Sequence, residues 1–461
     1  MTDDVAAAGD WLARPVDAAS LAVVRILFGA ILFAGLVRFM AEGWIEVLYV
    51  EPKIFLKYWG FAWVGVWSRA GMYAHYALLA GLALALAAGY RTRLAAALFF
   101  IGFTYVELVD VTNYLNHYYL VSIVALLMIF LPVGQVWSWD ACRTPSPSTT
   151  VPAWVLYLLR FQVAVVYLNA GLAKLGSDWL LHAQPLGIWL AARDETPLIG
   201  SWLASGWVAY AMSWGGFLFD TTIVLWLSLR RTRPFAYALV VVFHLLTHVF
   251  FDIGLFPFLM TALATIFFAP DWPRRFPGNV SPSFSRKGQG GGSYLPSRAA
   301  AVAIAVFCIV QVALPLRHLA YPGDVLWNEQ GMRWAWKVMV REKNGSITYH
   351  VRDRDSGRSW QLSPTRYLTW RQANEMAGQP DLVLQLAHHI AADLRARGVR
   401  DPEVRAEAWV SLNGRRAALM IDPSVDLTRI DDGVTSASWI LPAPQDPPLP
   451  VPAQLAALAG E

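Results

Sequence analysis

Long apolar stretches, separated by short polar loops, fill the first two thirds of the chain. Most of them approach the ~20 residues that an α-helix needs to cross a bilayer. Nine stretches of this kind lie at Ser20–Met40, Met72–Tyr90, Leu94–Leu108, His117–Pro132, Val151–Leu172, Leu203–Leu229, Phe235–Phe251, Leu255–Phe268 and Arg298–Leu316. The pattern predicts an α-helical polytopic membrane protein with about nine transmembrane helices. The fourth and eighth are short and are expected to be tilted or partly buried, and the broken aromatic stretch Trp44–Trp67 is interpreted as an interfacial excursion.

The pattern changes after Leu316, where alternating apolar and polar residues replace the long apolar runs. Turn-forming residues at Asn344-Gly345, Asp355-Ser356-Gly357 and Asn413-Gly414 predict β-hairpins. The stretch Pro380–Arg397 is typical of an amphipathic helix, stopped by the glycine that follows it. These signals together predict a small C-terminal α+β domain.

The chain is therefore expected to have three parts. A helical membrane domain covers residues 1–316, a small exported α+β domain covers 317–430, and a Pro-rich tail over 431–461 is expected to be extended and disordered. The Gly-rich stretch Ser281–Ser293 is interpreted as a flexible cytoplasmic linker before the last span.

Lysine and arginine are unevenly distributed between alternate loops, and this bias sets the orientation of a membrane protein. One set of loops carries Arg14, Arg91, Arg93, Arg143, Arg230, Arg231, Arg233, Arg274, Arg275, Arg286, Lys287 and Arg298. The alternate loops carry only Lys53, Lys57, Arg69, Lys174 and Arg193. We therefore expect a cytoplasmic N-terminus and, after an odd number of spans, a C-terminal domain on the exported side.

The composition supports this class, because the chain is 56% hydrophobic and only 15% charged, against about 25% charged residues in a typical soluble domain. The net charge of +4 is small, and its basic residues lie in membrane loops, which argues against a nucleic-acid partner. The N-terminus lacks the cationic region of a cleaved signal peptide. Cys142 lies in an interior loop and Cys308 inside a span, so the two are not expected to pair.

Three ionisable residues lie within the inner half of the predicted spans, where a charge is costly and is by default a functional hypothesis. Arg25 and Arg160 lie toward the cytoplasmic ends of the first and fifth spans, and Asp220 lies toward the same side of the sixth. We interpret all three as structural, with Asp220 paired to one of the arginines so that the pair holds helices together.

A second polar group lies near the outer face, at the ends of several spans. Its members are Asp110, Asn113, Asn116, His117, Lys174, His244, His248 and Asp252. Taken singly, each has a structural explanation, such as a helix cap, a satisfied core histidine or, for Lys174, a snorkelling anchor. Their shared depth makes the structural explanations less favourable, and Lys174 is then either an anchor or a base with a lowered pKa. No spacing matches a metal-binding motif, so no metal is expected.

Several segments, taken in order along the chain, resemble the vitamin K-dependent gamma-glutamyl carboxylase family, with a membrane part of the HTTM-domain type. The segments lie at Arg14–Gly29, Asp110–Leu120, Leu159–Trp179, Gly215–Asp220, Phe243-His244, Ile253–Phe256, Ala269–Arg274, Trp334–Val340, Ala408–Asn413 and Ile421–Asp426. They include Asn116-His117-Tyr-Tyr-Leu120 and Ala170-Gly-Leu-Ala-Lys174-Leu. No single motif is diagnostic, but the collinear set is specific.

The resemblance implies an enzyme that couples epoxidation of a quinol by dioxygen to carboxylation of glutamate side chains. The quinol is reduced vitamin K or a menaquinol-type quinol that arrives from the bilayer, and carbon dioxide is the second co-substrate. Lys174 is then the base that deprotonates the quinol, and His117 hydrogen-bonds it or stabilises negative charge. Asn116 orients the quinol, and Asp110, Asn113, His244 and His248 complete its binding site.

The resemblance also implies that the segment after the last span binds the acceptor glutamate of a peptide or protein. Arg333, Lys337 and Arg341 offer cations to an anionic substrate, and Trp334 and Trp336 can wall it. An equally weighted alternative is a first strand of the domain with its aromatic side chains in the core.

This sequence departs from the animal enzymes in three respects. Its exported region is much shorter, which puts recognition through a propeptide in doubt. Ala173 precedes Lys174 where the family often has a second lysine, and the cysteines of the family's disulfide have no counterpart, which implies noncovalent docking of the exported domain. Two other functions remain open: a membrane protein that binds or epoxidises a quinol without carboxylating protein, and a transporter or membrane scaffold.

Overall fold

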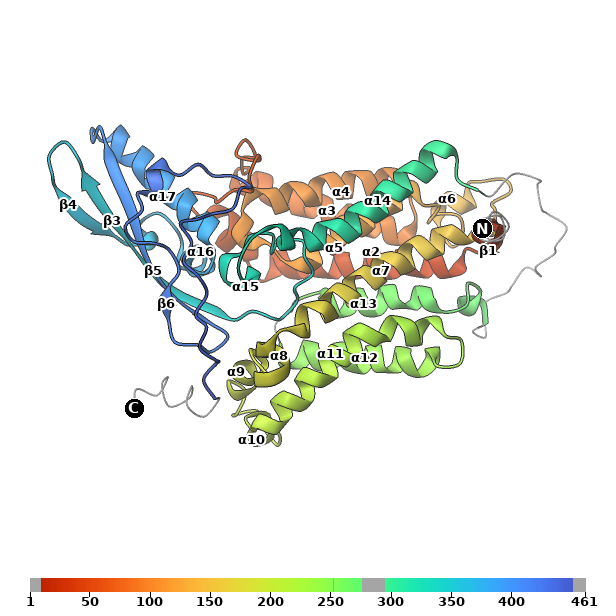
Figure 1. Ribbon diagram of the computed structural model, residues 1–461. Coiled ribbons are helices and arrows are strands. Elements are labelled where there is room, and N and C mark those ends of the chain that lie inside the picture. The colour runs from red at the N-terminus through yellow and green to blue at the C-terminus, as the bar shows by residue number, and fades with distance from the viewer. Residues whose placement is uncertain (1–9, 252, 276–294, 451–461) are drawn as a thin grey trace.

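The computed structural model describes residues 10–251, 253–275 and 295–450. It shows a layered bundle of helices that run roughly side by side, with a domain of sheet and helices seated on one end (Figure 1). Among the described residues, seven helices are long and apolar enough to cross a membrane. These are α2 (Ala19–Ala41), α3 (Arg69–Ala88), α4 (Thr92–Val109), α7 (Ala153–Leu172), α11 (Gly206–Ser228), α12 (Arg233–Phe250) and α14 (Arg298–Leu316).

Two shorter apolar helices account for the two remaining predicted spans. They are α5 (Asn116–Phe130) and α13 (Phe256–Ala264), the latter extended by a 3-10 turn. Each of the nine predicted ranges coincides with one of these helices, and the two that are short in the structure are the fourth and eighth, as predicted. The helical membrane class of the protein is therefore confirmed.

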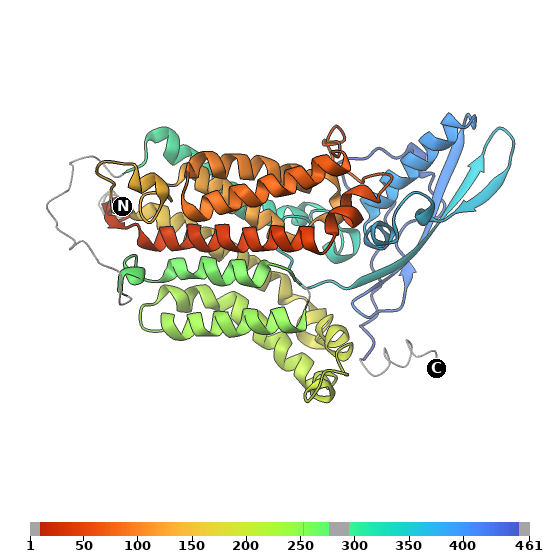
Figure 2. The same cartoon turned by 180° about the vertical axis from the view of Figure 1, so that it is seen from behind.

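The helices form two groups that meet along α7 and α13. One group consists of α2, α3, α4 and α5, packed in sequence order, and the other of α11 and α12. Figure 2 shows the first group in red and orange above the green helices of the second. Helix α13 contacts α2, α7 and α12, and α7 contacts α11, so these two helices connect the groups.

Short elements close the two ends of the bundle. At the end that holds the N-terminus, β1 (Pro15–Asp17) pairs antiparallel with β2 (Thr150–Pro152). At the same end, Asp17 forms an ion pair with Arg274 at a distance of 2.7 Å. The same end carries α6 (Trp139–Cys142). At the opposite end lie α8 (Ser177–His182), α9 (Leu186–Ala191), α10 (Gly200–Leu203) and the short π-helix Glu46–Val50 within the aromatic excursion.

The C-terminal domain, which the sequence analysis expects on the exported side, is built on a four-stranded antiparallel sheet of order β4-β3-β5-β6. Its strands are β3 (Lys343–Asp353), β4 (Ser359–Leu362), β5 (Pro402–Leu412) and β6 (Ala418–Leu419). The helices α16 (Trp370–Ala377) and α17 (Pro380–Ala396) pack against this sheet, and the four-residue helix α15 (Val325–Asn328) precedes it. The predicted α+β domain and its amphipathic helix are therefore present.

Two of the three predicted turns are confirmed and one was wrong. Asp355-Ser356-Gly357 joins β3 to β4, and Asn413-Gly414, with positive φ at both residues, follows β5. Asn344-Gly345 instead lies inside β3, opposite Ser411 and Val410. Glycine is needed at 345 because a Cβ there would lie 3.0 Å from the Ala377 carbonyl oxygen at the end of α16. The glycine thus marks a close approach of helix to strand.

Three further predictions concern the linker, the C-terminal tail and the two cysteines. The predicted linker Ser281–Ser293 lies outside the described residues, as do residues 451–461 of the tail. Residues 442–450 form neither helix nor strand. Cys142 and Cys308 are both free, as predicted.

Polar contacts dock the C-terminal domain onto the helix ends. Gln372 of α16 donates to Asp110 at 2.7 Å, and the Asp178 carboxylate receives Arg415 at 2.6 Å and Asn413 at 2.9 Å. Lys57 and Gln385 exchange two hydrogen bonds through the Lys57 backbone. The described contacts between the two parts are noncovalent, which agrees with the absence of a family-type cysteine pair.

The membrane orientation can be tested with a cysteine that the chain already contains. Cys142 is exposed at the end of the bundle opposite the C-terminal domain, and Ser356 is exposed at the β3–β4 turn. We expect a membrane-impermeant thiol reagent applied to intact cells to label Ser356→Cys and to reach Cys142 only after permeabilisation. Labelling of Cys142 alone in intact cells would reverse the orientation that the basic loops predict.

Candidate functional site

Lys174 lies at the end of α7, in the 3-10 turn Ala173–Leu175, and forms a buried ion pair with Asp220 of α11. The Lys174 Nζ is 2.8 Å from Asp220 Oδ2 and donates to the Ala170 carbonyl at 3.1 Å. Both residues are only 5% exposed. The ammonium also lies 5.1 Å from the centre of the Trp179 ring. Lys174 is therefore turned into the protein, whereas a snorkelling anchor would extend into solvent.

The predicted arginine partners of Asp220 were wrong. Arg25 donates to the backbone carbonyls of Leu86, Ala87 and Trp137, and Arg160 donates to those of Ile266 and Phe268. These carbonyls lie near helix ends, where intrahelical partners are missing. Both guanidinium groups thus bind carbonyl oxygens and neither pairs with Asp220, although Arg25 Nε is buried without a hydrogen-bond partner in the described structure. Asp220 pairs with Lys174 instead.

A small apolar cavity of about 70 Å³ lies beside the Lys174–Asp220 pair. Its polar lining groups are Lys174, Asp220, Tyr167, His244 and Thr247, and the remaining lining is mainly aliphatic and aromatic. His244 is 3% exposed, and its Nε2 lies 2.9 Å from the Tyr167 hydroxyl. Its Nδ1 is buried and has no hydrogen-bond partner among the described residues. A buried polar atom of this kind is costly unless a ligand or water pairs with it.

A second cavity, of about 320 Å³, holds His117 and Asn116 together with Arg38 and Trp44. His117 is 7% exposed and its ring lies 6.4 Å from that of Phe256. Asn116 accepts a hydrogen bond from the Tyr114 hydroxyl at 2.9 Å. Lys174 and His117 thus lie at the same end of the bundle, as predicted, but in two neighbouring cavities.

The remaining members of the outer polar group lie elsewhere. Asp110 is 1% exposed and accepts hydrogen bonds from Thr112 and Gln372, so it docks the C-terminal domain. Burial raises the pKa of its carboxyl. The side-chain nitrogen and oxygen of Asn113 are buried without a partner in the described structure. His248 is exposed on α12 and packs edge-on against Phe258, and Asp252 lies outside the described residues.

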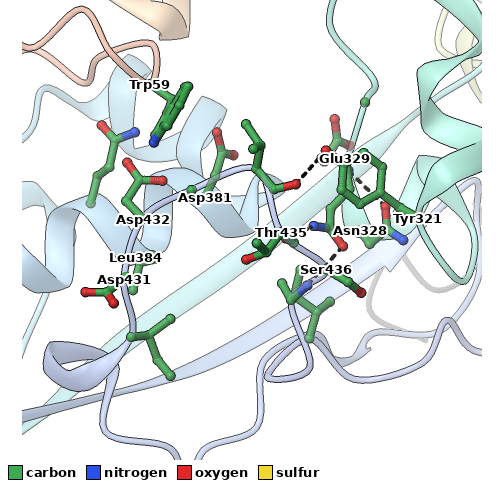
Figure 3. Close-up of a pocket in the computed structure, with 18 of the residues that line it drawn as sticks. Trp59, Tyr321, Asn328, Glu329, Asp381, Leu384, Asp431, Asp432, Thr435 and Ser436 are labelled. Atoms are coloured by element: carbon green, nitrogen blue, oxygen red, sulfur yellow. Dashed lines mark hydrogen bonds between the residues drawn. The ribbon is translucent and has the colours of Figure 1, made fainter.

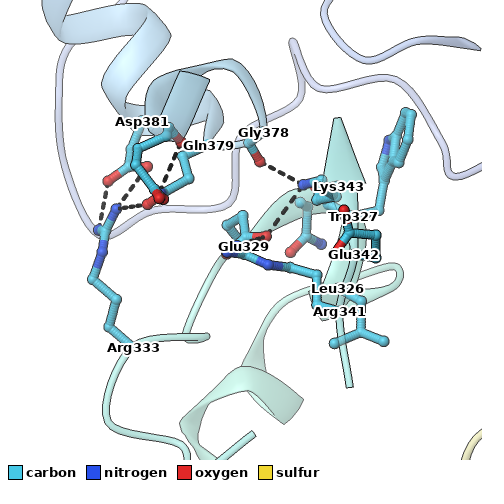
Figure 4. Close-up of polar contacts among 12 residues, drawn as sticks. Leu326, Trp327, Glu329, Arg333, Arg341, Glu342, Lys343, Gly378, Gln379 and Asp381 are labelled. Carbon is cyan, nitrogen blue, oxygen red and sulfur yellow. Dashed lines mark hydrogen bonds and ion pairs between the residues drawn. The ribbon is translucent and has the colours of Figure 1, made fainter. Parts of the chain in front are cut away.

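The three cations predicted to meet an anionic substrate differ in their surroundings. Figure 4 shows Arg333 bound to Asp381 and Gln379, and Glu329 shared by Arg341 and Lys343. Burial lowers the pKa of Lys343 to about 8. Lys337 forms no ion pair within the described structure, and burial lowers its pKa.

The two tryptophans of this segment have different neighbours. Trp334 stacks on Tyr58 at 5.7 Å and lines a cleft, whereas Trp336 is fully buried in the membrane-domain core, 5.0 Å from the ring of Tyr119. Trp334, Trp336 and Met339 all have left-handed backbone conformations, with φ of 61°, 54° and 55°. Non-glycine residues rarely adopt this conformation, and such strain concentrates at functional sites.

The cleft that Trp334 lines has a volume of about 750 Å³. It lies at the C-terminal domain, between the Tyr58–Phe61 loop, the start of α17 and residues 429–440 (Figure 3). Trp59 and the carboxylates of Asp381, Asp431 and Asp432 face it. Arg333 and Trp334 lie on this cleft, while Val338 and Met339, a few residues later, line the two smaller cavities.

Helical spacing could have revealed part of what the sequence analysis missed. Tyr167 and Lys174 are seven residues apart, which places them on one face near the end of α7, and Gly216 and Asp220 are four apart on α11. A Cβ at Gly216 would lie 3.5 Å from Trp179 and 4.0 Å from Lys174, so this glycine helps to keep the cavity open. No comparable signal in the sequence indicates that α7 and α11 are neighbours. Among the described residues, no group of three or more His, Cys, Asp or Glu is placed to hold a metal ion.

Comparison with known families agrees with this architecture. Residues 13–272, more than half of the chain, match the HTTM domain, and residues 296–446 match the lumenal domain of vitamin K-dependent gamma-carboxylase. The protein is thus a membrane protein of the HTTM class, with a carboxylase-type domain on one end. The chain belongs to the vitamin K-dependent gamma-carboxylase family. No solved structure matches it.

Proposed function

We propose that this protein is a quinol-dependent gamma-glutamyl carboxylase with its active site at the exported ends of α7, α11 and α12. The observation that carries the proposal is the buried Lys174–Asp220 pair beside an apolar cavity that is also lined by His244, whose Nδ1 is buried without a hydrogen-bond partner in the described structure. The proposal rests further on membership of the family and on the bilayer as the source of a lipid-soluble substrate.

The lining of the Lys174 cavity suits a quinol. Reduced vitamin K or a menaquinol, when bound, supplies with dioxygen the strong base that the reaction needs and leaves as its epoxide. The apolar walls accept a ring, and Lys174 and His244 Nδ1 can each meet a hydroxyl group. The cavity must widen to admit a whole quinol head group, and Met212 and Met339 in its lining are flexible enough to move.

Lys174 acts as the base in this proposal, and Asp220 acts through it. In a site of low dielectric, the charged ammonium–carboxylate pair is costly to bury. Moving its proton from the amine to the carboxylate gives two neutral groups, which cost less to bury. When that proton lies on Asp220, Lys174 is a neutral amine and can take a proton from a quinol hydroxyl. The 2.8 Å contact also fixes the position of the amine.

The overall reaction balances as follows. Quinol, dioxygen, carbon dioxide and a glutamyl residue give quinone epoxide, water, a γ-carboxyglutamyl residue and one proton. The Cγ–H bond of glutamate breaks and a Cγ–CO₂ bond forms, while the quinol is oxidised and dioxygen is reduced. His117 lies on the neighbouring cavity, where it can stabilise negative charge on the acceptor.

We assign acceptor binding to the exported cleft and the segment that leaves it. A peptide lying along Arg333 and Trp334 would follow that segment toward Met339 and the His117 cavity. Lys337 is the cation of this segment that is not already paired with a carboxylate of the described structure. Trp336 contributes as a buried support, because its side chain has no exposed surface.

Lys337→Gln is expected to raise the KM for a glutamate-containing peptide roughly fivefold, the effect of about 1 kcal/mol of lost attraction at a partly exposed site. The KM for the quinol should not change, because Lys337 does not line the Lys174 cavity. Lys53→Gln, at an exposed lysine of the same side, is the matched control. Equal peptide KM values for the two variants would remove Lys337 from acceptor binding.

The alternative function, quinol epoxidation without protein carboxylation, is favoured by one observation. Arg333 and Arg341 are already neutralised by Asp381 and Glu329, so two of the three cations near the acceptor path are occupied. Purified protein, reduced quinol, labelled bicarbonate and a Glu-rich peptide distinguish the two functions. Epoxide together with fixed carbon supports the carboxylase, epoxide alone supports the alternative, and neither product would refute both.

A further inference from the structure

A single partition separates the Lys174 cavity from the His117 cavity. Ile253, Phe256, Val338 and Met339 line both cavities, so these residues stand between them. They come from two segments that are distant in sequence: the entry into α13 and the strained segment of the exported side. The two cavities are therefore neighbours whose connection depends on a few side chains.

The cavities on either side of the partition differ in volume and in the exposure of their polar lining residues. On one side, Lys174 and Asp220 are 5% exposed and the cavity of about 70 Å³ is mainly apolar. On the other side, the cavity of about 320 Å³ is bordered by Arg38, whose side chain is 53% exposed. The partition thus lies between a mainly apolar cavity around a buried ion pair and a larger cavity that is bordered by an exposed charged side chain.

The half of the partition next to α13 is tightly constrained. Gly254 has a φ of 58°, and a Cβ at this position would lie 3.3 Å from the His117 ring. Phe256 begins α13 and its ring lies 6.2 Å from that of His244 and 6.4 Å from that of His117. This half is held between the two histidines, which leaves it little room to move.

The other half carries the side chain best suited to move. The segment is anchored by Trp336, which is fully buried, and by Val340, which is 3% exposed. Between these anchors, Met339 adopts a φ of 55°, a conformation that its own side chain disfavours. Methionine is unbranched and readily changes rotamer. The left-handed backbone at Met339 therefore holds a flexible side chain at the boundary between the two cavities.

We propose that Met339 is a gating and positioning residue, whose side chain closes the Lys174 cavity to water and opens it toward the acceptor glutamate. The inference rests on the proposed function, and it adds the element that couples its two half-reactions. A strong base formed in the Lys174 cavity is protonated by water unless water is excluded. Met339 therefore determines how many carboxylations follow from each epoxidation.

The test compares the ratio of epoxide formed to carbon fixed in purified variants. Met339→Gly removes the side chain and also relieves the left-handed backbone, because glycine adopts positive φ freely, so this variant is expected to fold. Because Met339 also lines the quinol cavity, the rate of epoxidation itself can fall, but we expect the ratio of epoxide to fixed carbon to rise about tenfold, since misplaced reactants lose large factors in rate. In D₂O, less deuterium should enter the glutamate γ-carbon per epoxide formed than in the wild type, because water protonates the base before it can remove the γ-proton.

Two further variants separate gating from general damage. Met339→Leu keeps apolar volume and should retain a ratio near that of the wild type. Met332→Ala removes a methionine from the same segment that lines neither cavity, and its ratio should not change. The thermal midpoint and the quinol KM of each variant report on folding and on the Lys174 cavity.

The possible results are distinct. A Met339→Gly enzyme that loses epoxidation and carboxylation in equal proportion, or keeps the wild-type ratio, would overturn the gate and leave the proposed function standing. A wild-type enzyme that forms epoxide but fixes no carbon would refute the carboxylase function, and the gate with it. A raised ratio in Met339→Gly, with normal ratios in Met339→Leu and Met332→Ala, would support both.

Discussion

Lys174→Arg is expected to abolish quinol epoxidation and glutamate carboxylation while the protein still folds. Arginine keeps the positive charge and can keep the ion pair with Asp220, so an anchoring or structural role would survive the change. A base must become neutral, and a guanidinium group does not lose its proton at physiological pH. The measurement is epoxide formation by purified protein, with the thermal midpoint as the control for folding.

Lys174→Ala is expected to be inactive as well, but to respond to an added small amine. Removal of the Lys174 side chain beyond Cβ leaves space next to the existing Lys174 cavity. A small amine bound in that space can replace the missing base. Lys174→Arg has no such space and serves as the matched control. Activity near the wild-type level in Lys174→Arg would falsify the assignment of Lys174 as the base.

Asp220→Ala is expected to lower the free energy of unfolding by about 3–5 kcal/mol, or to prevent assembly, because it leaves the Lys174 ammonium buried without its partner. The side chains of the pair are only 6% and 8% exposed, so water cannot replace the lost contact cheaply. Asp401→Ala, at an exposed aspartate of the exported domain, should change stability by less than about 0.5 kcal/mol. Thermal unfolding in detergent measures both.

A double variant distinguishes stability from catalysis at the same pair. Lys174→Leu combined with Asp220→Leu removes both charges, and apolar residues of similar size commonly replace a buried ion pair without loss of stability. We expect this variant to unfold near the wild-type temperature and to form no epoxide. A single Asp220→Ala variant with normal stability would show that the pair does not form in the membrane.

The helices and the general location of the site were accessible from the sequence because both depend on local composition. A bilayer-length run of apolar residues has few alternatives to a helix, since every backbone polar group must be satisfied within it. The turn at Asp355-Ser356-Gly357 and the end of α17 at Gly398 were likewise read from local chemistry. The turn predicted at Asn344-Gly345 was wrong because Gly345 responds to the close approach of α16, which is a tertiary contact.

The sequence by itself determined the membrane class, the order of its parts and the gathering of polar residues at one end of the bundle. Hydropathy and the distribution of basic loops carry that information along the chain. The tertiary structure decided which of these residues meet: Lys174 with Asp220, His244 with Tyr167, and His117 in a separate cavity. Hydropathy gave only an approximate depth: it placed Asp220 in the inner half and Lys174 at the outer face, although the two side chains are in contact. It gave neither the direction that a side chain faces around its helix nor the helix opposite. Those two quantities follow from packing, and packing placed the amine beside a carboxylate and Met339 between the two cavities.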